Sequence, residues 1–118
     1  MRYVDGFVVP VPKKKVAAYK RMAQKAGKIW CELGAVEYRE AAGDDLGSPG
    51  KSFPQLAKLK AGETVFFSWI VYKSRADRDR VNAKIMKDPR ILNMMKGKDM
   101  PFDYKRMAYG GFKVLVDM

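Results

Sequence analysis

The chain has 118 residues, 47% of them hydrophobic and 31% charged, and its 24 lysines and arginines against 13 acidic residues give a net charge of +11. This composition excludes a disordered chain, and the lack of a long apolar run excludes a membrane span. With no histidine and a single cysteine, the chain lacks the groups for a Ser-His-Asp or Cys-His catalytic site, an intrachain disulfide or an ordinary zinc site, so we expect neither a metal nor a cofactor.

The first part of the chain is predicted to form a strand, a helix and a second strand. Residues 3–11 are rich in β-branched and aromatic types and end on prolines, which indicates a strand. From residue 13 to residue 33, apolar side chains recur at steps of three and four, which is typical of one face of a helix. Residues 35–42 alternate in polarity as a strand does, with Val36 and Tyr38 on one face.

The second part of the chain is predicted to contain a long connection, a third strand and further helices. The connection, residues 43–62, is too long for a hairpin, and residues 52–57 within it read as a capped short helix. Residues 64–72 are apolar on both faces, which is typical of a strand that is covered on both sides. Helices are predicted at residues 75–87 and 90–95 from their capping residues and apolar stripes.

The last strand is predicted to run from Met107 through Val116, with Gly110 and Gly111 near its start, where a bulge or a close backbone approach is expected. The resulting order, β-α-β-β-α-β, predicts an α+β, ferredoxin-like fold with extra short helices, formed as one domain by residues 1–118. In this sheet we expect the third strand to separate the first strand from the last.

The apolar strand at residues 64–72 also predicts an assembly. Two long helices would cover one face of the sheet, but the other face is apolar as well and must also be buried. A second copy of the same sheet is the simplest cover. We therefore expect a homodimer in which two sheets meet face to face as a dimeric α+β barrel.

The beginning of the sequence carries no basic region followed by an apolar core and a small-residue cleavage site, which is the pattern of a secretory signal. The cytoplasm is therefore the expected compartment. We expect no association with a membrane, because the apolar stripe of the first helix is needed to cover the sheet.

Four segments of the sequence carry a family resemblance: residues 3–9, 67–70, 88–90 and 100–112. They resemble the YbaA-like family of small, uncharacterised bacterial proteins. The resemblance implies the dimeric α+β barrel superfamily, whose other branches include cofactor-free monooxygenases of aromatic substrates, haem-handling enzymes, chlorite-type enzymes and binding modules. It implies a fold more firmly than an activity, because the family has no established reaction.

The segment 100–112 combines acidic, basic, phenolic and glycine residues and is the best candidate for chemistry. In the strand at residues 3–11, Asp5 shares a face with apolar residues, where a carboxylate needs a partner. Such a partner could come from the segment before and at the start of the last strand, if that segment reaches across the sheet: Asp103, Lys105, Arg106 or Tyr109. We expect either a base at Asp5 or Asp103, with Arg106 orienting an anionic ligand, or a buried salt bridge that only fixes the loop.

The walls of the expected pocket are aromatic. Trp69, Phe102 and Tyr109 would enclose it at the end of the sheet. For Trp69 the alternative is a place in the core or in the dimer interface, where aromatic residues of central strands usually pack. Methionines late in the chain would either fill irregular gaps or line an adaptable ligand site: Met94, Met95, Met100 and Met107.

The predicted helix at residues 13–33 has a basic face made by Lys20, Arg21, Lys25 and Lys28. One interpretation is phosphate binding, which would make this a nucleic-acid-binding, RNA-associated protein. The other is a solvated face that keeps the protein soluble, because no aromatic platform or nucleic-acid motif accompanies the charge.

These features together predict a homodimeric small-molecule-binding module for an anionic or aromatic metabolite, with cofactor-independent turnover as an addition. The alternatives are a basic nucleic-acid-binding protein and a purely structural or regulatory dimer. The sequence leaves open whether the protein is an enzyme, because it contains no complete catalytic arrangement.

Overall fold

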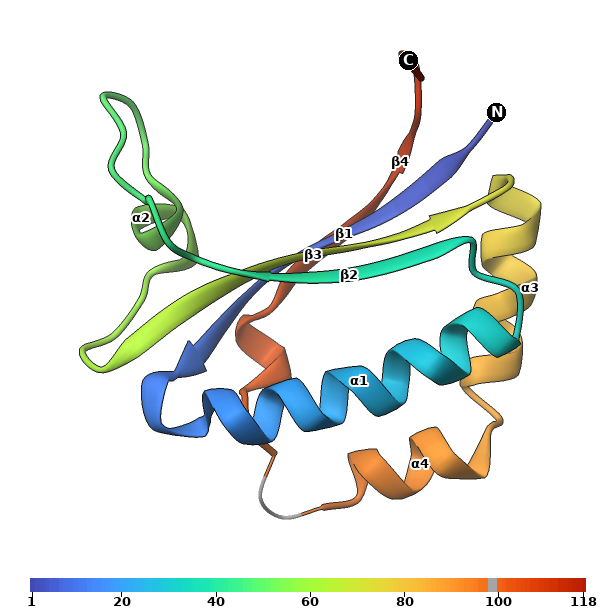
Figure 1. Cartoon of the computed structure of the whole chain (residues 1–118), viewed down its shortest axis with the longest axis horizontal. Coiled ribbons are helices and arrows are strands. Elements are labelled where there is room, and N and C mark those ends of the chain that lie inside the picture. The colour runs from blue at the N-terminus through green and yellow to red at the C-terminus, as the bar shows by residue number, and fades with distance from the viewer. Residues whose placement is uncertain (98–99) are drawn as a thin grey trace.

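The computed structural model describes residues 1–97 and 100–118, and within them one four-stranded antiparallel sheet carries its long helices on a single face (Figure 1). In chain order the elements are β1 (Tyr3–Pro12), η1 (Lys13–Lys15), α1 (Val16–Glu32), β2 (Glu37–Ala42), α2 (Phe53–Ala57), β3 (Glu63–Tyr72), α3 (Arg75–Ile85), α4 (Pro89–Met95), η2 (Tyr104–Arg106) and β4 (Ala108–Lys113). The α+β, ferredoxin-like arrangement with extra short helices is confirmed.

The order of the strands corrects one expectation. The sheet runs β2-β3-β1-β4, so the first and last strands are direct neighbours and the third strand does not separate them. In their register Asp5 lies opposite Gly111, and Phe7 lies opposite Tyr109. Each β-α-β unit skips one position in the sheet, and the other unit fills it; β1 and β3 therefore occupy the centre and β4 lies outside β1.

The ends of three predicted elements shift by a few residues. The last strand ends at Lys113 rather than Val116, because its partner on β1 is Tyr3, where β1 begins. One further hydrogen bond, from the Val114 amide to the Arg2 carbonyl at 3.0 Å, closes the ladder. The first helix is preceded by the separate turn η1, and α3 ends at Ile85 rather than at residue 87.

The helix starts follow their capping residues, as the sequence predicts. Ser52 forms a capping box with Gln55: the Ser52 hydroxyl accepts from the Gln55 amide, and the Gln55 side chain accepts from the Ser52 amide. Ser74 accepts from the backbone amide of Asp77 at the start of α3, and Asp88 accepts from that of Arg90 at the start of α4.

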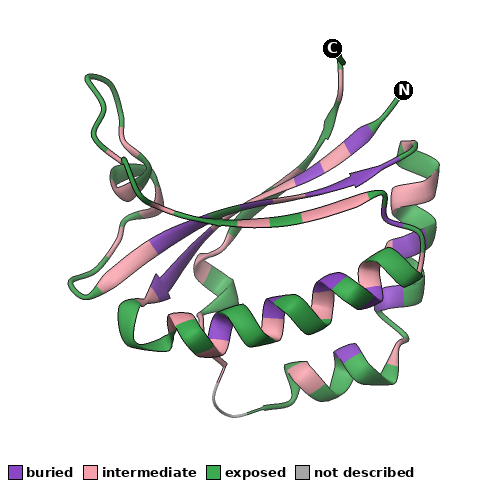
Figure 2. Cartoon of the chain, in the orientation of Figure 1, coloured by how far each residue is buried: buried purple, intermediate pink, exposed green. Residues whose placement is uncertain are grey.

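The core lies between the sheet and the helices, where Figure 2 shows buried residues along both layers. It divides into two clusters of buried side chains. One joins β3, α3 and α4 to the end of α1 and contains Ile29, Ala35, Ile70, Tyr72, Val81, Ile85 and Ile91. The other joins the start of α1 to β1 and β3 and contains Val9, Val11, Tyr19 and Phe66.

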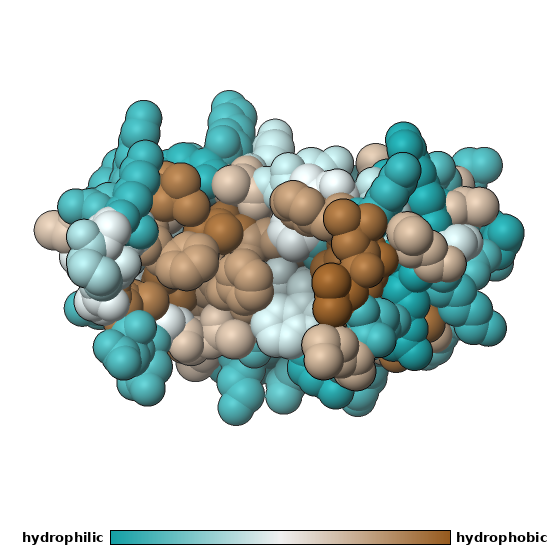
Figure 3. Space-filling model, turned by 90° about the horizontal axis from the view of Figure 1, so that it is seen from above, coloured by the Kyte–Doolittle hydropathy of each residue, from teal (hydrophilic) through white to brown (hydrophobic). Residues whose placement is uncertain are grey.

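The opposite face of the sheet, the open face, has no long helix over it (Figure 1). The short helix α2 covers only one end, where the Phe53 ring lies 5.8 Å from the Phe67 ring. Phe67 and Phe112 remain 45% and 62% exposed. Figure 3 shows hydrophobic side chains in the middle of this face and hydrophilic ones around it, so the expected apolar second face is present.

Candidate functional site

A cavity of about 280 Å³ lies between the two core clusters, under α1 and α4. It exists because small side chains face each other there: Ala23 and Ala26 on α1 point toward Ser68 on β3, and none of them fills the space between helix and sheet. A cavity of roughly 150 Å³ with apolar walls is enough to hold benzene, so this one has room for one or two rings.

The cavity wall is almost entirely apolar. Its aromatic members are Phe7, Tyr19, Trp30, Tyr38, Phe102 and Tyr104. Its methionines are Met22, Met94, Met95, Met100 and Met107. The four late methionines named in the sequence therefore share one wall, and their flexible thioethers suit a space that adapts to its contents.

Glu40 on β2 brings a carboxylate to the wall of this apolar space. The phenol of Tyr19 donates a hydrogen bond to Oε1 of Glu40, and the phenol of Tyr38 donates to Oε2, each at 2.8 Å. Burial first, and then the neighbouring Glu40 carboxylate, raise the pKa of both phenols, so both stay protonated as donors.

Tyr38 reaches this position because Gly27 lies above it on α1. A Cβ atom at Gly27 would lie 2.8 Å from Cδ1 of the Tyr38 ring, which is closer than side chains tolerate. The helix can thus pass directly over the ring, and the phenol extends to Glu40. On the far side of Glu40 an open groove continues between α1 and the edge strand β2, bordered by Lys20 and Lys28.

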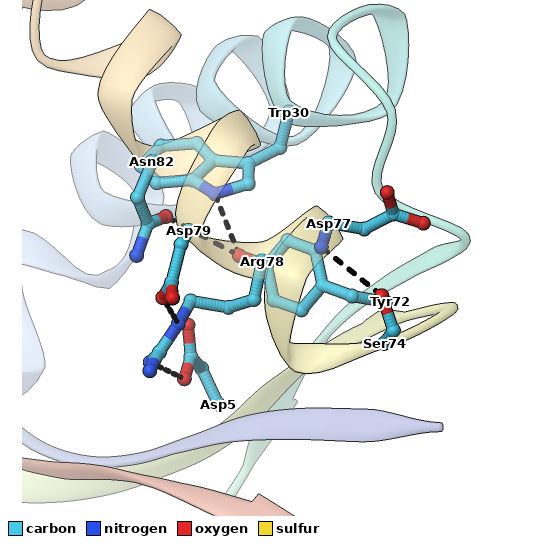
Figure 4. Close-up of polar contacts among 8 residues, drawn as sticks. All are labelled: Asp5, Trp30, Tyr72, Ser74, Asp77, Arg78, Asp79 and Asn82. Atoms are coloured by element: carbon cyan, nitrogen blue, oxygen red, sulfur yellow. Dashed lines mark hydrogen bonds and ion pairs between the residues drawn. The ribbon is translucent and has the colours of Figure 1, made fainter. Parts of the chain in front are cut away.

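Asp5 is buried, with 2% of its surface exposed, but it does not pair with Asp103 or Arg106 as expected. Its partner is Arg78 on α3, whose Nη1 lies 2.7 Å from Oδ1 of Asp5 (Figure 4). The guanidinium also stacks over the Tyr3 ring at 4.8 Å from its centre. Burial raises the pKa of Asp5, and the charge and hydrogen bond of Arg78 oppose that rise.

A second group of polar contacts supports this ion pair from above. The indole nitrogen of Trp30 donates to the Tyr72 hydroxyl at 3.1 Å, and that hydroxyl lies 3.5 Å from Oδ1 of Asn82 (Figure 4). Among the described residues no buried side-chain nitrogen or oxygen lacks a partner. The Asp5 region is therefore a structural network whose buried polar groups already have hydrogen-bond partners, rather than a site with polar groups free to bind a substrate.

Arg106 pairs with Glu63 at the start of β3, with its two terminal nitrogens 2.6 Å and 2.8 Å from the two carboxylate oxygens. It also donates to the carbonyl of Lys58, at the end of α2. Asp103 is exposed and accepts from the Lys105 amide, which caps the short turn η2. Both residues thus fasten the segment before β4, and neither lines the cavity.

The three aromatic residues expected to wall one pocket lie on two faces of the sheet. Phe102 lines the cavity, with its ring 5.5 Å from that of Tyr19. Tyr109 is on the same face but lies behind Phe7, on which it stacks at 5.6 Å. Trp69 projects onto the open face, because successive side chains of a strand point to opposite faces and the preceding residue, Ser68, faces the cavity. On the open face its indole donates a hydrogen bond to Glu37.

The four basic residues of the first helix are all exposed on α1: Lys20, Arg21, Lys25 and Lys28. They lie away from the core face of α1, which is marked by Tyr19, Ala23 and Ile29. All four side chains are therefore accessible to solvent or to a partner.

Glu40 was not predicted as a site residue, although the pattern of its strand contained a signal for it. Side chains two residues apart on a strand share a face, so the face predicted for Val36 and Tyr38 also carries Glu40. A carboxylate on a core face requires donors, and Tyr19 in the apolar stripe of α1 was available as one.

Neither a metal site nor a membrane segment is found in the described part of the chain. Residues 1–97 and 100–118 contain no group of three side chains from His, Cys, Asp and Glu that could hold a metal ion. No helix within the same residues combines the length and the apolar character needed to cross a bilayer.

Comparisons with known proteins give a family and a fold. A family model described as "Protein of unknown function (DUF1428)" matches residues 2–104. The uncharacterized protein YbaA of Escherichia coli strain K12 is 46% identical over 119 residues, with 99% of each sequence covered, and the Shigella flexneri protein of that name gives the same values. The expected YbaA-like resemblance is thus confirmed.

A solved structure supports the fold independently. The crystal structure of a dimeric ferredoxin-like protein from an uncultured marine organism superposes with a TM-score of 0.61 and covers the whole of both chains. Its sequence is 11% identical, so the likeness concerns the fold alone.

Proposed function

Because this chain belongs to the DUF1428 family, whose function is unknown, we propose a function from its own geometry: it is a homodimer that binds a small, largely apolar aromatic molecule in the cavity of each protomer. The observation that carries this proposal is the cavity of about 280 Å³ with aromatic and methionine walls. Cavities of this kind are the usual sites of small ligands. The cytoplasm stays the predicted compartment.

The cavity favours an aromatic ligand over the anionic one that the sequence also allowed. Arg106, the residue expected to hold an anion, is engaged by Glu63 outside the cavity. Arg39 borders the cavity, but its guanidinium is 3.3 Å from the Glu37 carboxylate on the open face. Cofactor-independent turnover would have to use Glu40 and the two phenols, because Asp5, Asp103 and Arg106 do not line the cavity.

The open face supports the dimer part of the proposal. It exposes Phe67 and Phe112 beside the exposed Phe53 and Leu56 of α2. Contiguous apolar surface of this kind usually marks a protein interface, and a second copy of the same face is the simplest partner for it. A related fold described as dimeric agrees with this assembly.

The binding proposal is tested by calorimetric titration with naphthylmethanol, a neutral two-ring probe. Ala26 lines the cavity, whereas Ala17 lies exposed on the same helix, so Ala26→Phe and Ala17→Phe form a matched pair. We expect saturable binding to wild type and to Ala17→Phe, and at least tenfold weaker binding to Ala26→Phe, because the new ring occupies the ligand's space. Absence of saturable binding to wild type, or equal affinity in both variants, would contradict the proposal.

The dimer is tested by light scattering at micromolar concentration. Phe67→Glu places a charge within the exposed apolar surface of the open face and is expected to give a monomer. Met86→Glu is the control, because Met86 is 67% exposed at the end of α3, away from that face, and its variant should remain dimeric. A wild-type protein that runs as a monomer would overturn this part.

A nucleic-acid-binding role is the second candidate, supported by the +11 charge and the exposed basic residues of α1. Retention on immobilised RNA that persists at physiological salt, and that falls when Lys20, Arg21, Lys25 and Lys28 are replaced together by glutamine, would favour it. Retention that vanishes at that salt would leave only bulk charge.

A further inference from the structure

From the surroundings of Glu40 we infer that this residue sets the ligand class of the cavity, by selecting aromatic molecules that carry a protonated amine over neutral and anionic molecules of the same shape. The inference rests on the proposed binding function and adds the chemical class of the ligand. It follows from the hydrogen bonds that Glu40 still has to offer, from its charge and from the aromatic walls around it.

The carboxylate of Glu40 is held in place by two hydrogen bonds and can still accept further ones. A carboxylate offers about four lone-pair directions, two on each oxygen. Tyr19 takes one direction on Oε1, and Tyr38 takes one on Oε2. Each oxygen therefore keeps the capacity to accept from a donor in the cavity, while the two phenols fix its orientation from β2 and α1.

Glu40 forms no direct ion pair within the described chain. The carboxylates of Asp5, Glu63 and Asp88 each lie within 3.0 Å of an arginine nitrogen. In residues 1–97 and 100–118, no lysine or arginine nitrogen lies within the 4.0 Å ion-pair distance of Glu40. Phenols supply hydrogen bonds but no positive charge. An ammonium group in the cavity would supply that charge, whereas a carboxylate or phosphate would be repelled.

The walls next to Glu40 suit the rest of such a molecule. Tyr19, Tyr38 and Trp30 all border the cavity, and the Trp30 and Tyr38 rings lie 6.2 Å apart. Aromatic faces attract an ammonium group as well as burying apolar rings. The site thus combines one anionic acceptor with aromatic walls, which is the chemistry that recognises an aromatic amine.

The experiment compares three probes of one shape by calorimetric titration near pH 7: naphthylmethylamine, which is protonated there, naphthylmethanol and naphthoate. For wild type we expect the amine to bind about tenfold or more tightly than the alcohol, and the naphthoate to bind least. In Glu40→Gln, a neutral residue of nearly equal size, the amine should lose this advantage over the alcohol.

Tyr38→Phe is the matched control, because it also breaks a hydrogen bond of Glu40 but leaves the charge in the cavity. It should keep the preference for the amine. An amine that binds no better than the alcohol in wild type, or a preference lost equally in both variants, would overturn the inference. Binding of the alcohol to wild type, and its weakening in Ala26→Phe, report on the proposed function separately from the preference for the amine.

Discussion

Asp5 and Glu40 are two carboxylates on the same face of one sheet, yet they have opposite surroundings. Asp5 is 2% exposed and lies 2.7 Å from the guanidinium of Arg78, with the Tyr3 ring covering that cation. Glu40 is only partly buried, is held by two phenols and borders a cavity. The first carboxylate has an arginine as its ion-pair partner, whereas the second has no direct ion pair in residues 1–97 and 100–118.

The difference separates a structural role from a binding role. A buried ion pair with all its hydrogen bonds made has nothing left to offer a ligand, and its removal costs stability. An oriented carboxylate beside an empty apolar space can bind a partner without any rearrangement of the fold. Substitutions at the Asp5 network should therefore change stability, and substitutions at Glu40 should change binding.

The largest effect is expected for Arg78→Ala. It leaves Asp5 buried without its cation and should lower the free energy of unfolding by about 3–5 kcal/mol near pH 7, measured by urea denaturation. This loss should shrink as the pH falls. In the variant, burial raises the pKa of Asp5 without opposition from Arg78, so Asp5 becomes protonated as the pH falls, and a protonated carboxyl needs no cation.

Two variants sharpen this result. Arg80→Ala removes a 60% exposed arginine of the same helix, paired with Asp77, and should cost less than about 1 kcal/mol. The double variant Asp5→Asn, Arg78→Ala should be more stable than Arg78→Ala alone, since the uncompensated charge is then absent. Equal losses for Arg78→Ala and Arg80→Ala would show that the ion pair does not stabilise the fold.

A smaller effect is expected for Gly111→Ala, across the ladder from Asp5. Its new Cβ atom would lie 2.7 Å from Cε2 of Tyr3, so Tyr3 would have to move from its place over Arg78. We expect a loss of about 1–3 kcal/mol in thermal unfolding. The neighbouring Gly110→Ala meets nothing closer than 3.8 Å and should stay within about 1 kcal/mol of wild type.

The smallest effect concerns Glu63, a carboxylate at the start of β3 that Arg106 holds. The hydrogen bond and charge of Arg106 lower the pKa of Glu63 from 4.5 to about 2 in the folded protein. Since the folded value lies below the unfolded one, this contribution to stability is complete above pH 4.5 and disappears as the pH falls toward 2.

Glu63→Gln should therefore be less stable than wild type at neutral pH, and the gap should close between pH 4.5 and 2. The comparison of the two proteins isolates Glu63 from Asp5, whose raised pKa makes protonation favour the folded state. A gap that stays constant down to pH 2, measured by denaturation at each pH, would contradict the role of this pair.

Most of the elements could be predicted because their signals are local. The helix α1 and the strand β3 are predicted by the spacing of apolar side chains within each element. The starts of α2, α3 and α4 are marked by the capping residues Ser52, Ser74 and Asp88. Each signal thus lies within the element that it predicts or directly before it. The β-α-β-β-α-β order of these elements along the chain then predicted the fold, and the family resemblance agreed with it. The exact end of β4 was harder to predict, because it depends on where its partner strand begins.

The site was predicted less well because its contacts join distant residues. The carboxylate of Asp5 was correctly recognised as needing a partner, but the partner stands 73 residues away on α3. Arg106 was expected as that partner, but the register of β4 aligns Asp5 with Gly111, and Arg106 lies before the strand, where it pairs with Glu63. Trp69 was placed with Phe102 although the alternation of β3 turns it to the other face.

The sequence by itself determined the helices, the strands, the apolar second face of the sheet and the presence of a buried carboxylate, because backbone propensity and periodicity act over short distances. Only the tertiary structure decided which cation neutralises Asp5 and which phenols hold Glu40. It also decided where Ala23, Ala26 and Ser68 face each other and leave a cavity. Such contacts depend on strand register and on how α1 crosses the sheet, and no local pattern in the chain encodes either one.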